Sequence, residues 1–136
     1  MRKEILGITL CSLFLAGCAD LVITSVHDAP LTGAGLRMMK ATVKNDGLRA
    51  APESRTRLEV KTPTSAFAEK ANMPTPALGR GEQRDLDLWP FNMFQEIPAG
   101  QCIEARVCAD SGNTVQEGWL GGESNNCRTT PICRNQ

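Results

Sequence analysis

The chain has 136 residues, of which 41% are hydrophobic and 4% aromatic, and its 15 basic and 15 acidic side chains balance. This length allows one domain with one modest core, and leaves no room for a second. Because basic and acidic side chains are equal in number, no basic patch dominates the sequence. Binding of nucleic acid or acidic lipid through bulk charge is therefore not supported.

The first eighteen residues have the pattern of an exported lipoprotein. A basic start at 1–3 is followed by an apolar run at 5–15 and by Leu-Ala-Gly-Cys at 15–18. The run is shorter than the roughly 20 residues of a spanning helix, so cleavage is expected. Leu-Ala-Gly-Cys resembles the lipobox of bacterial lipoproteins. That resemblance implies cleavage before Cys18, diacylglycerol on its thiol and an acyl chain on its new amino terminus. Two or three acyl chains anchor a protein stably in a membrane, where one chain would be marginal.

An ordinary signal peptide with an incidental cysteine is the alternative interpretation of this start. The expected division is a lipoprotein signal peptide at 1–17, a lipidated amino terminus at 18–20 and one domain at 21–136. Because Ala19 follows the acylated cysteine, the outer membrane of the bacterial envelope is the expected location. The first strand is expected to begin at 20–21, two residues after Cys18, so the domain should lie close to the lipid surface.

The mature chain alternates with a period of two, which is typical of strands. Strands are expected at 21–26, 36–44, 56–62 and 85–88. Pro90 is expected to end the last of these, and residues 63–81, rich in Pro and Gly, to form a long surface connection. Within that connection, residues 65–71 could form a short helix. Short strands separated by turn residues predict an all-β sandwich.

Four cysteines lie in the carboxyl-terminal third, at Cys102, Cys108, Cys127 and Cys133. The outer two residue numbers have the same sum as the inner two, and residues directly opposite in an antiparallel pair have a constant sum. One hairpin register therefore predicts the disulfides Cys102–Cys133 and Cys108–Cys127. Joining Cys102 to Cys108 would close a run of roughly 20 Å, whereas bridged Cα atoms lie about 4.4 to 6.8 Å apart. The third pairing would cross the strands.

A zinc site is a poorer interpretation of these thiols, because zinc ligands usually lie two to four residues apart and exported compartments are oxidising. The sequence contains no C-x-x-C redox motif. The same hairpin register places Ile103 opposite Ile132 and Glu104 opposite Pro131. A proline there fits an edge strand, so the last strand is predicted to lie at a sheet edge with its cysteines on the solvent side.

Several segments, taken in order, resemble the CARDB family, the cell-adhesion-related domain found in bacteria. These segments lie at 19–26, 41–47, 79–82, 109–117 and 123–126. The resemblance implies an immunoglobulin-like sandwich of about seven strands over 21–136, in which 102–108 and 127–133 are the last two strands. The chain departs from the family in the insertion at 118–122 and in its disulfides, which are not a general mark of the family.

The lengthened loop at 109–126 is the candidate functional site. Trp119 and Leu120 lie among glycines there, either folded back onto the sandwich or presented to a partner protein as an anchor. The loop also carries oxygen ligands that could hold Ca²⁺, at Asp110, Asn113, Glu117 and Glu123. No EF-hand spacing supports that cation site, and the same residue types are typical of tight turns.

Motifs for catalysis are missing from the sequence, which has neither G-x-S-x-G nor H-E-x-x-H nor a P-loop. Its only histidine is His27, and Asp85 and Asp87 alternate with leucines as on a solvated strand face. We therefore expect no enzyme and no cofactor, but a membrane-anchored binding or adhesion module that recognises another envelope protein. The alternative is a structural or carbohydrate-binding lipoprotein, for which Trp89 and Trp119 are the available indoles.

Overall fold

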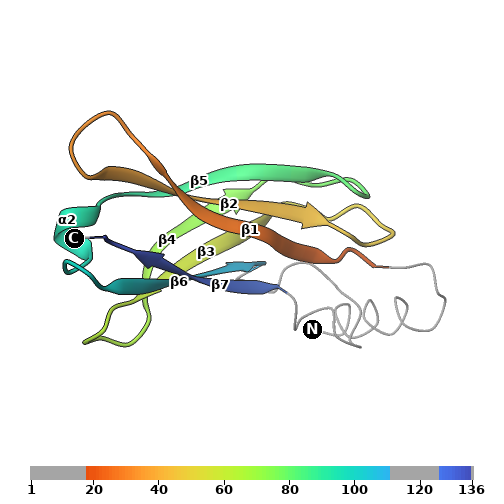
Figure 1. Ribbon diagram of the computed structural model, residues 1–136. Coiled ribbons are helices and arrows are strands. Elements are labelled where there is room, and N and C mark those ends of the chain that lie inside the picture. Colours follow the sequence, from red (N-terminus) through yellow and green to blue (C-terminus); the bar gives the residue numbers. More distant parts are fainter. Residues whose placement is uncertain (1–17, 111–125, 136) are drawn as a thin grey trace.

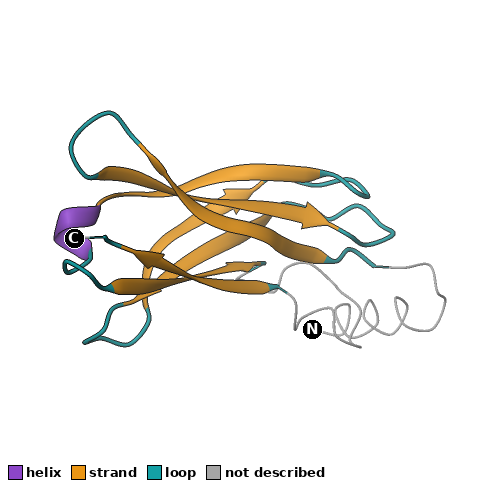
Figure 2. Cartoon of the chain, in the orientation of Figure 1, coloured by secondary structure: helices purple, strands orange, loops and turns teal. Residues whose placement is uncertain are grey.

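The computed structural model describes residues 18–110 and 126–135, which form two antiparallel sheets packed face to face (Figures 1 and 2). The three-stranded sheet has the order β1-β2-β5 and the four-stranded sheet the order β4-β3-β6-β7. The elements of the described residues are β1 (Leu21–Pro30), β2 (Leu36–Asn45), β3 (Ser54–Lys61), β4 (Ala68–Thr75), β5 (Gln83–Asn92), α2 (Met93–Glu96), β6 (Cys102–Ala109) and β7 (Cys127–Cys133). The predicted all-β, immunoglobulin-like sandwich of seven strands is confirmed.

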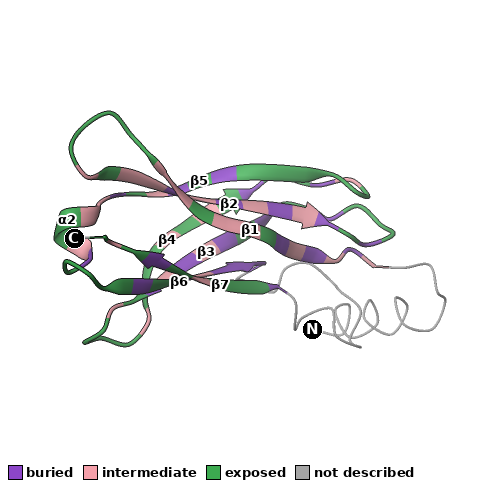
Figure 3. Ribbon diagram, viewed as in Figure 1, coloured by how far each residue is buried: buried purple, intermediate pink, exposed green. Residues whose placement is uncertain are grey.

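Alternating side chains of the strands build the core between the sheets. Every second residue of β2, β3 and β6 faces inward, and Figure 3 shows the resulting buried bands. The central strands contribute Met39, Ala41, Val43, Leu58, Val60, Ile103, Ala105 and Val107, all 2% exposed or less. Burial of one such Leu, Ile, Val or Met side chain is worth about 1.5–3 kcal/mol, which drives the two sheets together.

The β6–β7 hairpin has the predicted register. Ile103 lies opposite Ile132 and Glu104 opposite Pro131. Both predicted disulfides, Cys102–Cys133 and Cys108–Cys127, are formed, each between Cα atoms 4.0 Å apart. β7 is an edge strand, as its proline predicted. Three of the bridged cysteines are exposed, whereas Cys108 is buried at 6% exposure beside β3.

The expected long connection at 63–81 was wrong, because it contains strand β4 (Ala68–Thr75) and no helix at 65–71. β4 pairs with β3 at the edge of the four-stranded sheet, with Pro74 opposite Arg55. An edge strand pairs on one side only, so a proline is tolerated where its nitrogen faces away from the partner. Its mostly exposed, polar side chains hid the strand from a search for apolar alternation.

Pro90 does not end its strand, which was the second wrong expectation. β5 continues to Asn92, with Pro90 opposite Met38 next to a register shift in β2. The reason is again position, because β5 is the edge of the three-stranded sheet. The chain then turns through the short helix α2, whose N-cap Asn92 accepts a hydrogen bond from the Phe94 backbone N–H at 2.9 Å.

The connections gather at two ends of the sandwich (Figure 1). One end carries Cys18, the 46–53 and 76–82 loops, and the residues where β6 ends and β7 begins; we call it the Cys18 end. The opposite end carries the 31–35 and 62–67 loops, α2 and residue 134; we call it the α2 end. This arrangement separates the amino terminus from most of the exposed apolar side chains described below.

Candidate functional site

The predicted lipidation residue is held directly against the sandwich. The Cys18 carbonyl accepts a hydrogen bond from the Leu48 N–H at 3.0 Å, and the Asp20 carbonyl accepts one from the Asp46 N–H at 2.9 Å. Between them Ala19 is buried, at 4% exposure. Residues 18–20 therefore belong to the rigid body and are not a linker.

The buried side chain of Asn45 organises this contact. Its Oδ1 accepts hydrogen bonds from the N–H groups of Asp20 and Gly47, each at 3.0 Å. Its Nδ2 donates to the carbonyls of Arg49 at 2.7 Å and Leu78 at 3.1 Å. One fully buried amide, at 0% exposure, thus joins the amino terminus to both loops of the Cys18 end, with its donor and acceptor groups satisfied.

Gly47 allows the amino terminus to approach. A Cβ at this position would lie 1.9 Å from the Cys18 carbonyl oxygen and 2.6 Å from the Asp20 nitrogen, so a side chain would displace the backbone of residues 18–20. The sequence analysis used the Asn-Asp-Gly run only as a turn signal. Its role as the seat of the amino terminus is a long-range property that local sequence does not reveal.

Cys18 takes part in a disulfide in this structure. A thioether-linked lipid needs the same sulfur atom, so the disulfide and the lipid exclude each other. The lipid on Cys18 stays a prediction.

The base of the candidate loop also lies at the Cys18 end (Figure 1). The Ala109 N–H donates to the Asn126 carbonyl at 2.8 Å. Asp110 is 2% exposed and has a positive φ of 52°, and Asn126 is 5% exposed. Both residues take part in further interactions.

Of the predicted site residues in this loop, only Asp110 is described; the predicted partner contacts Trp119 and Leu120 and the predicted ligands Asn113, Glu117 and Glu123 lie outside the described residues. Within residues 18–110 and 126–135, no three His, Cys, Asp or Glu side chains gather as a metal site would require. No helix in that part of the chain is long and apolar enough to cross a membrane.

The side chains of His27, Asp85 and Asp87 lie on the surface of the three-stranded sheet. His27 is exposed on β1 opposite Lys40. Asp87 accepts from Lys40 Nζ at 2.9 Å, and Asp85 from Thr42 Oγ1 at 2.7 Å. These contacts are cross-strand pairs on a solvated face and converge on no pocket.

The α2 end carries an apolar cluster that the sequence analysis missed. Leu31, Leu36 and Phe94 are 40%, 40% and 50% exposed there. Phe94 packs over Gly35, where a Cβ would lie 2.5 Å from its ring, and the Arg134 guanidinium lies 4.8 Å from the ring centre. Leu31 and Phe94 are 63 positions apart in the sequence, so no local pattern signals the cluster.

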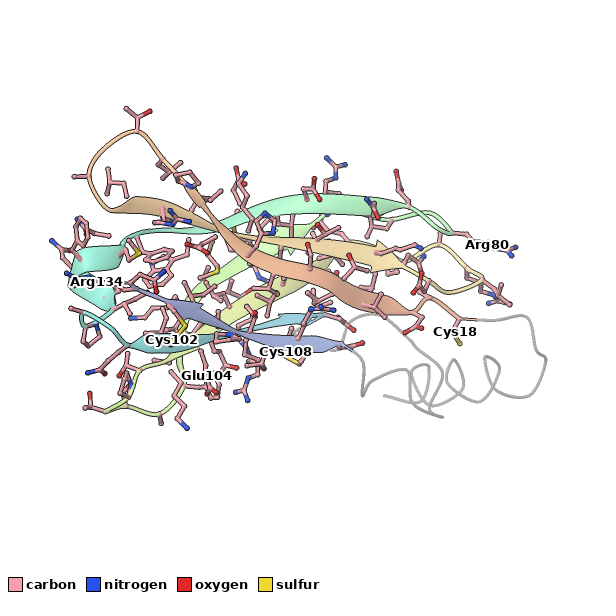
Figure 4. The ribbon with its side chains drawn as sticks, viewed as in Figure 1. Cys18, Arg80, Cys102, Glu104, Cys108 and Arg134 are labelled. Carbon is pink, nitrogen blue, oxygen red and sulfur yellow. A yellow bond between two sulfur atoms is a disulfide. The ribbon has the colours of Figure 1, made fainter. Side chains whose placement is uncertain are left out.

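A shallow hollow of about 380 Å³ lies beside the Cys102–Cys133 disulfide. Two of its lining residues, Cys102 and Glu104, are labelled in Figure 4. The hollow is lined by Lys61, Thr62, Pro63, Cys102, Glu104 and Pro131. None of these residues is aromatic, so the hollow offers no ring on which a sugar could stack.

The two packed sheets of three and four strands define an immunoglobulin-like sandwich domain. The model of the CARDB family matches residues 18–130. The chain therefore belongs to the CARDB family, whose domains are non-catalytic modules of the cell surface.

Two solved CARDB-type structures agree with this assignment. A CARDB domain from Pyrococcus furiosus, in complex with di-metal ions, superposes with a TM-score of 0.62 at 21% identity, over 86% of this chain and 89% of that one. A domain of a putative cell surface protein from Methanosarcina acetivorans gives 0.63 at 22% identity, over 88% and 94%. At these identities the likeness shows the fold.

Beta-glucosidase 3B from Thermotoga neapolitana is also similar, with a TM-score of 0.56 at 17% identity. The similarity covers 87% of this chain but 16% of the glucosidase, so it does not indicate catalysis. No curated protein sequence matches the chain.

Proposed function

We propose that this chain is a lipid-anchored, non-catalytic binding module of the bacterial envelope that recognises another envelope protein. Membership in the CARDB family supports the binding role. The observation that carries the proposal is the seat of residues 18–20, which joins the predicted lipid attachment point to the sandwich by hydrogen bonds of 2.9 and 3.0 Å. A lipid on Cys18 would thereby hold the whole domain at the membrane without an intervening linker.

The proposed anchor requires the Cys18 thiol to be reduced when the lipid is attached. Precursors are made in a reducing cytoplasm and meet oxidants after export. The proposal is therefore that acylation reaches the thiol before a disulfide does, followed by cleavage before Cys18. Ala19 in the next position supports delivery to the outer membrane.

Two surfaces are candidates for the protein partner. One is the loop of Trp119 and Leu120, whose base residues Asp110 and Asn126 lie at the Cys18 end. The other is the apolar cluster of the α2 end. Trp119 in the first and Phe94 in the second are aromatic side chains of the kind enriched at protein interfaces.

Cross-linking in intact cells that produce the lipidated protein tests the proposal. The variant Trp119→Ala with Leu120→Ala removes the first surface, and the matched variant Leu36→Ala with Phe94→Ala removes the second. We expect a defined protein to be captured by the unmodified chain and to be lost, by tenfold or more, in one variant only. An empty capture in all three would contradict protein recognition and favour a glycan or purely structural role.

The glycan alternative finds little support among the described aromatic side chains. Trp89 is stacked on Phe91, with ring centres 4.8 Å apart. The Lys70 ammonium lies 5.5 Å from the centre of the Trp89 ring. Its ring is half-buried. Sugar recognition needs an open aromatic face, so Trp89 is poorly placed for it.

Calcium binding by Asp110, Asn113, Glu117 and Glu123 stays a prediction. The Pyrococcus furiosus domain is in complex with di-metal ions, which supports testing this chain for a metal. Asp110 is buried at the base of the loop, where a cation would need its carboxylate to exchange present contacts for the ion.

A further inference from the structure

We infer that the Cys18 end is a membrane-contact surface, in which the Leu48 side chain enters the lipid interface and Arg49 and Arg80 bind phosphates of anionic headgroups. This inference rests on the proposed membrane anchor, since it says which face of the domain the anchor brings to the bilayer. It requires only that the chain before Ala19 is embedded, whether through a lipid or through an uncleaved apolar segment.

The position of Leu48 follows from backbone contacts. Its N–H donates to the Cys18 carbonyl at 3.0 Å, so the two residues are direct neighbours. Its side chain is 51% exposed, which makes it the most exposed large apolar residue of the described chain. Because residues 18–20 are seated on Asn45 and Gly47, a bilayer that receives Cys18 must also reach Leu48.

Two exposed arginines at this end can reach the same bilayer. Arg80 projects from the tip of the 76–82 loop, on the same end as Cys18 in Figure 4, and Arg49 is exposed in the neighbouring loop. The carboxylate of Glu82 is exposed in the same loop, where Oε1 accepts from the Gly79 N–H at 2.7 Å.

Four other described carboxylates share the Cys18 end, and one of them, Asp110, is 2% exposed. Asp46 pairs with Lys44 Nζ at 3.1 Å, and Asp20 holds the seat of the amino terminus through its backbone N–H and carbonyl. Glu53 is exposed at the foot of the 46–53 loop, next to β3. Arg49 and Arg80 are exposed, and neither forms a salt bridge within the described residues. Each basic side chain near an anionic lipid surface strengthens attachment on the order of fivefold.

The opposite end has the complementary property. Its apolar residues Leu31, Leu36 and Phe94 lie across the sandwich from Cys18 (Figure 1). With the Cys18 end on the bilayer, that cluster faces away from the lipid. The inference therefore orients the whole domain, with its long axis away from the membrane.

Spin labels test this orientation on the full chain purified from cell membranes and reconstituted in vesicles of phosphatidylethanolamine and phosphatidylglycerol. One label is placed through Leu48→Cys, a second through Arg80→Cys, and a control at the α2 end through Thr64→Cys. We expect the labels at 48 and 80 to be protected from a water-soluble nickel chelate several-fold more than the label at 64. Labels at both 48 and 80 are used because one substitution alone could disturb its own loop.

Charge reversal supplies the second arm. Arg49→Glu with Arg80→Glu should lower the equilibrium constant for membrane contact of the label at 48 by tenfold or more, whereas the matched reversal Lys61→Glu should leave it unchanged. Equal nickel access at 48, 80 and 64 in membrane-bound protein would overturn the orientation alone. Protein that carries no lipid and fractionates away from membranes would overturn the proposed anchor, and this inference with it.

Discussion

Asn45 shows how one side chain positions the amino terminus. Its amide accepts two backbone N–H groups and donates to two carbonyls while fully buried. A buried amide of this kind is favourable only while all of its partners are present, because each unsatisfied group costs about 1–3 kcal/mol. The residue therefore stabilises a specific geometry of three segments and not merely the core.

Replacement of Asn45 by Ala should cost about 3 kcal/mol or more, because carbonyls of the two loops and the Asp20 N–H lose their buried partner together. Urea unfolding followed by tryptophan fluorescence measures the change. The matched control is Asn72→Ala on the exposed face of β4, which should cost within about 0.5 kcal/mol. Similar losses for both variants would contradict the role assigned to the buried amide.

The buried hydroxyl pair of Thr56 and Thr75 provides a second prediction at this scale. Their Oγ1 atoms are 2.6 Å apart and both residues are 0% exposed. Thr56→Val alone should destabilise by about 1–2 kcal/mol, since it leaves the Thr75 hydroxyl unpaired, whereas Thr56→Val with Thr75→Val should be nearly neutral. A double-mutant cycle in urea checks this, and additive losses would contradict it.

At the scale of elements, the β6–β7 hairpin was predictable because cysteine spacing, side-chain parity and a proline all indicated one register. β4 was not predictable, because an exposed edge strand such as Ala68–Thr75 needs no apolar alternation. Pro90 did not end its strand because β5 is also an edge strand, where a proline is tolerated. The apolar cluster at the α2 end and the seat of Cys18 depend on contacts between distant loops, which no local pattern encodes.

Each of the two disulfides of the hairpin should stabilise the domain by a similar amount. Their sequence separations are 31 and 19 residues, for which loop closure predicts about 3 kcal/mol for either bridge when the other is intact. Cys108→Ala with Cys127→Ala, and separately Cys102→Ala with Cys133→Ala, should each lose about that amount in urea. Removal of all four should cost at least the sum. A loss below about 1 kcal/mol for either pair would contradict this account.

Calcium at the 109–126 loop makes a separate prediction for that element. A site with the affinity of extracellular calcium modules, a Kd of about 10⁻⁴ to 10⁻³ M, would stabilise the domain by about 1.4 kcal/mol at ten times its Kd. A thermal melt with calcium, with magnesium as the control, measures this. Glu117→Gln with Glu123→Gln should abolish any calcium-specific rise in Tm. An unchanged Tm in the unmodified chain would remove calcium from the account.

At the scale of the whole molecule, the proposed anchor would assign different roles to the two ends of the sandwich. The Cys18 end would meet the lipid, and the α2 end, on the opposite side, presents apolar side chains away from it (Figure 1). The absence of a linker after Cys18 makes this separation strict, because the domain cannot turn independently of its anchor. Inserting a flexible Gly-Ser segment of about ten residues between Cys18 and Ala19 should therefore abolish the protection of a label at 48 without detaching the protein.

The identity of the amino-terminal residue in membranes tests the central claim most directly. Mass spectrometry of the amino-terminal peptide from membrane-purified protein should find a chain that begins at Cys18, with diacylglycerol on the sulfur and an acyl chain on the nitrogen. A chain that begins elsewhere, or a Cys18 sulfur still held in a disulfide, would contradict the account of a lipid-anchored envelope module.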